Sequence, residues 1–299
     1  FDGGLFDDDF APDLPGDGYW DFQALLRLRT RVEAAGLKLY AIENIPGHFY
    51  DKIRMGAPGR DEQIEKVCMT IRNMGRAGIH VLGYHFMLVG VWRTEYSPRG
   101  RGGAKVTIYD HEQAKNAPIW EHGEFTDEMM WDNLTYFLKA VVPVAEQEGV
   151  MLALHPDDPP VEKLAGTARI IRSIQAYQRV LQIVPSPANG LEFCQGTVAE
   201  MAHTPEEVYA AIREFAGQGK IAYVHFRNVD ATVPTFAETF IEEGRIDMLY
   251  AMRCYQEVGY KGVFIVDHTP GIVGDTPWGH RGRAYGIGYM KALLKCVGA

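Results

Sequence analysis

Four side chains of metal-binding types stand at the carboxyl ends of predicted strands. They are His155 in MLALHPDDPP, Cys194 in LEFCQG, His225 in IAYVHFRN and Asp267 in VFIVDHTP. Each apolar run is short, is bounded by Gly, Pro or Asn, and leads into a helical stretch, which is the pattern of a parallel α/β barrel. Residues that follow the strands of such a barrel face a common centre. The four side chains therefore predict one mononuclear site for a divalent ion such as Mn, Fe, Co or Zn.

Each of these residues also has an ordinary structural interpretation. His155 and His225 are then plain polar residues at strand ends, Cys194 is a small buried hydrophobic residue, and Asp267 caps a helix. For any one residue alone, that interpretation is the favoured one. Because all four follow strands that converge on one centre, we expect a set of metal ligands instead.

The rest of the chain alternates predicted strands with predicted helices. Strands are expected at 37–43, 79–86, 150–155, 189–194, 221–226 and 262–267. Helices are expected at 19–35, 60–77, 126–147, 168–184, 204–216, 247–258 and 283–297. This order is typical of successive βα units.

We therefore predict a TIM (β/α)8 barrel. Such a barrel has eight strands, so the first one or two are expected upstream of this chain or absent from it. The chain begins at Phe1 with the acidic, glycine-rich stretch FDGGLFDDDFAPDLPGDG, which is not an initiator sequence. An open doubly wound sheet is the alternative, but it would not bring six strand ends to one centre, and no glycine-rich phosphate loop follows any strand.

Composition favours a small-molecule enzyme in a single domain. The 299 residues, 46% of them hydrophobic, suffice for one large core, and no linker interrupts residues 1–299. A net charge of -9 argues against a nucleic-acid partner. The apolar runs fall short of the roughly 20 residues that span a bilayer, and no signal segment is visible. Cysteines without CxxC spacing argue against a disulfide framework. We expect a cytoplasmic homo-oligomer.

Longer segments resemble the mannonate dehydratase family. HPDDPP and YQRVLQIVPSPANGLEFCQGT carry the resemblance most specifically, and IENIPGHFYDKI, GYHFMLVGVWRTEYS, VHFRNV, VDHTP and GRAYGIGYMKAL extend it over about residues 37 to 295. That family has a barrel related to the xylose-isomerase-like barrels and converts D-mannonate into 2-keto-3-deoxygluconate and water with a divalent metal, usually Mn. The resemblance implies a metal-dependent dehydratase of D-mannonate or a related aldonate, with manganese as the expected ion.

The resemblance also implies roles for individual residues. The four strand-end residues match the family's metal ligands, and His268 matches a catalytic histidine. Arg93 and Arg227 match positions suited to a sugar-acid carboxylate, which a guanidinium grips through two parallel hydrogen bonds. Glu43 is expected near the mouth of the barrel. Asp157 and Asp158 are expected either to accept from a ligand histidine or to shape the turn before two prolines.

Several positions depart from the family's pattern. Trp278, in TPWGHRGR, stands where the family has a proton-transferring tyrosine, and indole cannot transfer a proton. His85 replaces an asparagine of the expected substrate pocket. The second proton-transfer group is then His85, His280 or Tyr285, with His280 ranked first because it shares the loop of Trp278. His280 and Tyr285 also have ordinary interpretations, as a surface residue and a packed helix residue. We expect D-mannonate itself to be dehydrated poorly and another acid to be preferred.

Three functions remain open on these residues. The first is a carbon-oxygen lyase: dehydration removes the proton next to a carboxylate and expels the neighbouring hydroxyl, and a divalent ion and a histidine assist both steps. The second is an isomerase or epimerase of an uncharged sugar, which would keep the metal without a carboxylate clamp. The third is a noncatalytic sugar-acid binder, in which the metal persists and proton transfer is lost. Product analysis with aldonic acids and ketoses separates them.

Overall fold

A computed structural model describes residue 14 and residues 16–298. Most of the acidic opening stretch, residues 1–13 and 15, lies outside this part of the chain. None of the helices within the described ranges is both long enough and apolar enough to cross a membrane.

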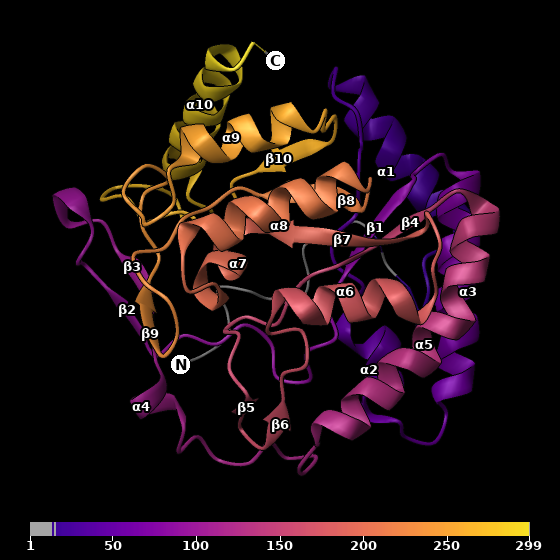
Figure 1. Cartoon of the computed structure of the whole chain (residues 1–299). Coiled ribbons are helices and arrows are strands. Elements are labelled where there is room, and N and C mark those ends of the chain that lie inside the picture. Colours follow the sequence, from indigo (N-terminus) through magenta and orange to yellow (C-terminus); the bar gives the residue numbers. More distant parts are fainter. Residues whose placement is uncertain (1–13, 15, 299) are drawn as a thin grey trace.

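A curled sheet of parallel strands forms the centre of the structure (Figure 1). Its strands, in spatial order, are β1 (Val81–Tyr84), β4 (Met151–Leu154), β7 (Asn189–Cys194), β8 (Ile221–His225) and β10 (Val263–Ile265). Most helices lie around the outside of these strands. Those of seven or more residues are α1 (Phe22–Ala34), α2 (Gly47–Met55), α3 (Arg60–Arg76), α5 (Asp127–Glu148), α6 (Ile174–Ile183), α7 (Gln195–Met201), α8 (Pro205–Gly217), α9 (Met248–Glu257) and α10 (His280–Cys296). The expected alternation of strands and helices is confirmed.

The first expected strand, 37–43, is reduced to one bridge in the structure. Ile42 pairs with Leu82 of β1, and its amide donates to the Val81 carbonyl over 3.1 Å. Tyr40 adds a hydrogen bond from its hydroxyl to the Ala222 carbonyl, over 3.1 Å. The described residues thus supply five parallel strands and one bridging segment, where a closed barrel of this class has eight strands.

Helix boundaries follow local capping groups. Thr204 accepts from the Glu207 amide and Pro205 opens α8, which confirms the predicted start of that helix. The helix expected at 168–184 is shorter, because Ser173 caps α6 and the preceding residues form a small hairpin. Its two strands are β5 (Lys163–Leu164) and β6 (Thr167–Ala168). Helix α10 begins at His280 rather than 283, because the Asp275 carboxylate accepts from the amides of its first turn.

A second sheet of three antiparallel strands was not predicted. It consists of β2 (Glu95–Ser97), β3 (Val106–Asp110) and β9 (Thr235–Ala237), in that order. The short helices η1 (Arg101–Gly103) and α4 (His111–Ala114) flank β3. Strands β2 and β3 follow β1, whereas β9 follows β8, so the sheet joins two loops of the barrel. It lies beside the barrel at the left of Figure 1, and residues of β2 and β3 line the cavity described below.

The interior of the barrel beneath the strand ends contains polar groups. Because side chains alternate along a strand, Glu192 shares a face with Cys194, and Tyr223 shares a face with His225. The Tyr223 hydroxyl donates to Glu192 Oε2 over 2.5 Å. Gly83 leaves the room for this contact, since a Cβ there would lie 2.0 Å from the Tyr223 hydroxyl oxygen. The predicted metal site therefore rests on a buried tyrosine–carboxylate pair.

Candidate metal centre and active-site cavity

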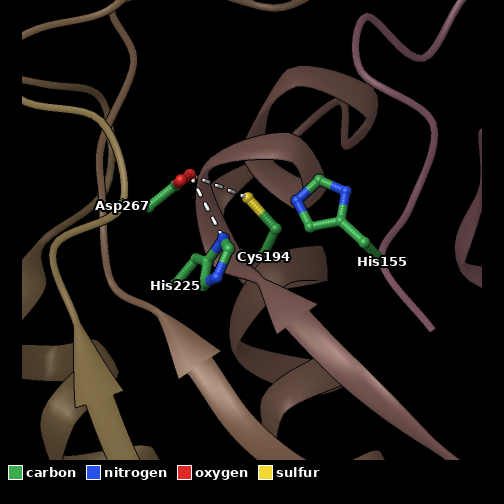
Figure 2. Close-up of side chains that lie close together, drawn as sticks. All are labelled: His155, Cys194, His225 and Asp267. Atoms are coloured by element: carbon green, nitrogen blue, oxygen red, sulfur yellow. Dashed lines mark hydrogen bonds and ion pairs between the residues drawn. The ribbon is translucent and has the colours of Figure 1, made fainter. Parts of the chain in front are cut away.

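The four strand-end residues come together at one place (Figure 2). Cys194 ends β7 and His225 ends β8, and the two are partners in the strand register. His155 follows β4 directly, and Asp267 stands two residues after β10 with a left-handed backbone, φ 53°. One potential ligand atom from each residue lies within 4.8 Å of the others. This grouping matches the arrangement expected from the sequence.

The ionisation of these side chains suits a divalent cation. Burial alone would raise the pKa of Cys194, but Arg227 and the neighbouring histidines outweigh it and lower the pKa to about 5. The thiol is therefore a thiolate at neutral pH, the form that binds metals. Thr197 steadies the sulfur with two hydrogen bonds, from its amide over 3.4 Å and from its hydroxyl over 3.1 Å. Burial likewise opposes the ionisation of Asp267, but His225 and His268 lower its pKa well below the usual range.

The position of His225 Nδ1 also fits a metal. This buried nitrogen has no hydrogen-bond partner among the described residues, although it lies 3.2 Å from Asp267 Oδ2. Burial acts to lower the pKa of His225, yet Asp267, Glu43 and Glu192 outweigh burial and raise it. A metal that binds here must therefore displace a proton. Two imidazoles, a thiolate and a carboxylate form a donor set that fits Mn, Fe, Co or Zn.

Two carboxylates hold the other ring nitrogen of His225. Glu43 Oε2 lies 3.1 Å from Nε2, and Glu192 Oε1 lies 2.9 Å from it. Burial first and Glu43 second raise the pKa of Glu192 to about 7. Such partners fix the orientation of a ligand histidine. Glu192 was not predicted, although its place two residues before Cys194 in the same strand was a usable signal.

Arg93 binds protein carboxylates in the structure. Its Nη1 and Nη2 atoms lie 2.5 and 2.8 Å from the two oxygens of Asp158, and Nη2 also lies 2.6 Å from Glu238 Oε1. Only 1% of the Arg93 side chain is exposed. Burial opposes its charge, but Asp158 and Glu238 outweigh burial and raise the pKa of Arg93. Its donors are therefore already committed to groups of the protein.

Arg227 is committed in the same way. It donates to Asp158 over 2.8 Å, to Glu200 over 2.7 Å and to Asp267 over 2.9 Å, and it does not line the cavity. The expected carboxylate clamp of Arg93 and Arg227 is corrected accordingly, because both guanidinium groups already pair with internal carboxylates. Arg227 instead holds Asp267 in place.

The two aspartates of HPDDPP have structural roles. Asp158 joins Arg93 to Arg227, and Asp157 accepts from the Ile171 amide over 2.7 Å. His155 Nδ1 lies 2.7 Å from the Pro156 carbonyl and needs no aspartate partner. Of the two alternatives expected for these aspartates, hydrogen bonding to a ligand histidine is therefore not found among the contacts of the described residues.

Breaking this buried network should destabilise the fold. We expect Arg93→Met to lower the free energy of unfolding by about 3 kcal/mol, because Asp158 and Glu238 would keep their charges in a dry site. Chemical denaturation measures the change. Arg99→Met is the matched control, since Arg99 is largely exposed and pairs with Glu95 on the surface. Equal stability of the two variants would contradict the network's role.

His268 stands beside the candidate metal ligands. Its Nδ1 lies 2.6 Å from Glu238 Oε1, and its Nε2 lies 3.5 Å from Asp267 Oδ1. Arg93 anchors Glu238 in turn. The contact with Glu238 orients the imidazole ring, and His268 belongs to the wall of the cavity described below. Glu238 follows β9, a strand that was not predicted, so its role had no visible signal in the sequence.

One cavity of about 1160 Å³ opens at the strand ends. It is large enough for a six-carbon sugar acid. Of the residues singled out from the sequence, its wall contains Glu43, His85, Arg93, His155, His225, Asp267, His268 and Trp278. Three of the four candidate metal ligands, His155, His225 and Asp267, thus share one cavity with His268 and Trp278. Cys194 is buried behind this wall.

His280 and Tyr285 lie outside this wall. The His280 ring lies 2.5 Å from the Thr276 hydroxyl, and the Tyr285 hydroxyl donates to Glu242 over 2.6 Å. Both side chains are exposed. His280 is the first residue of α10, and the loop before it faces the cavity through residues that include Trp278. Neither His280 nor Tyr285 is therefore placed for the proton transfer expected of it.

Comparisons with known proteins show which family the chain resembles. A family model described as D-mannonate dehydratase (UxuA) matches residues 10–122 and 119–299. The mannonate dehydratase of Thermotoga maritima is 33% identical over 317 residues, which cover 94% of this chain and 85% of that protein. Mannonate dehydratase 2 of Halalkalibacterium halodurans is 31% identical over 309 residues, covering 94% and 86% respectively.

Solved structures give the same result. The crystal structure of mannonate dehydratase from Streptococcus suis serotype2 superposes with a TM-score of 0.85 at 32% identity, covering 96% of this chain and 85% of that one. A xylose isomerase-like TIM barrel protein from Mycobacterium smegmatis shares the fold, with a TM-score of 0.58 at 15% identity, covering 94% and 81%. The predicted barrel class and the predicted resemblance are confirmed. The chain belongs to the D-mannonate dehydratase family.

Proposed function

We propose that this chain dehydrates a sugar acid, D-mannonate or a closely related aldonate, to the 2-keto-3-deoxy acid and water, with manganese as its ion. The observation that carries this proposal is the group of two histidines, one thiolate and one carboxylate beside His268, in a chain of this family. Metal dependence belongs to the family, and manganese is the ion that the resemblance to that family implies. The mixed donor set also suits Fe, Co or Zn.

The chain's residues divide the work of dehydration between them. His155, Cys194, His225 and Asp267 would hold the ion. When bound, a divalent ion polarises a substrate oxygen and stabilises negative charge that develops beside the carboxylate. His268 takes or gives one proton, because it lines the cavity and Glu238 orients its ring through Nδ1.

A second proton-transfer group is needed for the departing hydroxide. Of the three candidates from the sequence, only His85 lines the cavity. Its side chain is buried, and the Tyr50 hydroxyl donates to its backbone carbonyl over 2.7 Å, which fixes the local backbone. We therefore assign the second transfer to His85, and no longer to His280 or Tyr285.

A substrate panel tests the proposed function. The manganese-loaded chain is incubated with D-mannonate, related aldonates and ketoses, and the products are identified by mass spectrometry and NMR. We expect a 2-keto-3-deoxy acid from at least one aldonate and no interconversion of ketoses. Interconverted ketoses without dehydration would support the isomerase or epimerase alternative. Binding without any product would support the noncatalytic binder.

Trp278 should decide which aldonate is preferred. It lines the cavity and cannot transfer a proton. We expect the unmodified chain to turn over D-mannonate more slowly than another aldonate, and Trp278→Tyr to raise the rate with D-mannonate about tenfold. Trp120→Tyr, outside the cavity wall, is the control and should leave the rate unchanged. Efficient D-mannonate turnover by the unmodified chain would refute this prediction.

We infer that the protein is a cytoplasmic homo-oligomer, and that residues 1–299 form one barrel domain whose partner is a small sugar acid. Four free cysteines support a reducing compartment, and three of them are buried. Size-exclusion chromatography with light scattering tests the oligomeric state, and limited proteolysis tests the single domain.

A further inference from the structure

The proposed substrate carries a carboxylate whose counter-charge must come from the cavity wall. A divalent ion in the candidate centre would be neutralised by Cys194 and Asp267, because cysteine and aspartate bind metals as thiolate and carboxylate, so the centre would have no net positive charge. The two histidines bind metals as neutral ligands. An acidic substrate therefore needs a separate cation for its carboxylate.

Within the described part of the chain, Arg93, Lys105 and Arg283 are the lysines and arginines of the cavity wall. Arg93 is committed to Asp158 and Glu238. Lys105 is exposed, and its ammonium lies 5.4 Å from the centre of the Tyr96 ring. A flexible, hydrated ammonium is a weak carboxylate receptor. Arg283 is left as the stronger candidate.

Arg283 is held in place without using its terminal nitrogens. Its Nε donates to the Trp278 carbonyl over 3.1 Å, and its guanidinium carbon lies 4.2 Å from the centre of the Trp278 ring. Neither Nη atom pairs with a carboxylate of the described residues. Partial burial lowers the pKa of Arg283, and Asp267 opposes that effect from nearby. The guanidinium is thus oriented and partly buried, and within the described part of the chain its Nη atoms form no ion pair.

Close packing of α10 brings Arg283 near the candidate metal centre. Gly286 lies one turn further along the helix and close to Val266. A Cβ atom on Gly286 would be 2.6 Å from Cγ1 of Val266. Val266 directly precedes Asp267. The helix therefore approaches the loop of the ligand closely, and the first turn of α10 delivers Arg283 to the cavity wall.

We propose that Arg283 binds the carboxylate of the sugar acid through its two Nη groups, while Trp278 covers one face of its guanidinium. This inference rests on the proposed function for its substrate class. Two parallel hydrogen bonds from one guanidinium match the geometry of a carboxylate. Trp278 then sets specificity indirectly, because it fixes the position of the group that anchors the substrate.

The test compares D-mannonate with neutral D-mannonamide, which lacks the charge at the same end. The manganese-loaded chain is studied as the unmodified protein and as Arg283→Gln, Arg283→Lys, Lys105→Gln and Arg281→Gln. Arg281 is the matched control, because it is exposed on the same helix and outside the cavity wall. Where the chain turns over D-mannonate, KM and the inhibition constant of D-mannonamide are measured. Where it does not, calorimetry gives both dissociation constants.

We expect Arg283→Gln to weaken the binding of D-mannonate about 30-fold. The binding of D-mannonamide should change by no more than about twofold, because only the acid loses charged hydrogen bonds. Arg283→Lys should weaken the binding of D-mannonate about fivefold, since lysine keeps the positive charge but cannot form two parallel hydrogen bonds. Arg281→Gln should match the unmodified protein. Metal content and melting temperature are recorded for every variant, and Arg283→Lys decides the question if Arg283→Gln does not fold.

The outcomes separate this inference from the proposed function. Equal weakening of the acid and the amide by Arg283→Gln, or a larger selective loss in Lys105→Gln, would overturn the role of Arg283. If the chain dehydrates an aldonate but Arg283→Gln has no selective effect on the acid, the role of Arg283 is overturned and the proposed function stands. Selective binding without a dehydrated product would support Arg283 and refute the proposed function.

Discussion

Alanine in place of Cys194 or His225 should remove most of the bound metal while the barrel stays folded. Each change deletes one of the four metal ligands. Loss of a residue that only hydrogen-bonds to a ligand can lower metal affinity by roughly 100-fold, and loss of the ligand itself should lower it further. The strands keep their own apolar contacts, so the fold does not depend on the ion. Elemental analysis after dialysis measures the metal, and circular dichroism checks the fold.

Cys254→Ala is the matched control for this prediction. Cys254 is as buried as Cys194 but lies in α9, away from the candidate ligands. We expect it to retain its metal and to lose only a little stability. Full metal occupancy in both Cys194→Ala and His225→Ala would refute the ligand set. Metal loss in Cys254→Ala as well would indicate a general loosening of the barrel.

His268→Ala should lower turnover about 10³-fold with the best aldonate, because general acid–base catalysis contributes about 10²- to 10⁴-fold. Metal content should change little, since Asp267 remains as a ligand. The measurement is kcat together with metal content.

His280→Ala removes the same kind of side chain from the start of α10, outside the cavity wall, and serves as the control. A large loss of turnover in His280→Ala with little loss in His268→Ala would reverse the assignment.

The sequence was sufficient to predict the parts of the site that depend on local pattern. Short apolar runs marked β4, β7, β8 and β10, and the residue type at each strand end marked a candidate ligand. These signals survive in the structure because parallel strands of a barrel end at one rim. Strand 37–43 shrank to a bridge because only Ile42 finds a backbone partner in β1.

The environment of the arginines could not be predicted in this way. Arg93 and Arg227 follow strands and face the site, which suggested a carboxylate ligand. Their actual partners include Asp158, Glu200 and Glu238, which come from three other segments of the chain. Whether a guanidinium is free or neutralised depends on contacts between distant residues, and no spacing in the sequence reports them. Arg283 was passed over for the same reason.

The adjacency of Asp267 and His268 in the chain has a mechanical consequence. One peptide bond joins a candidate metal ligand to the group that moves a proton, and the left-handed backbone at Asp267 leaves little freedom between them. A wider or narrower ion that shifts the Asp267 carboxylate would carry the imidazole with it. The size of a bound ion would therefore act on the position of His268 as well as on Asp267, against the hold that Glu238 has on the imidazole ring.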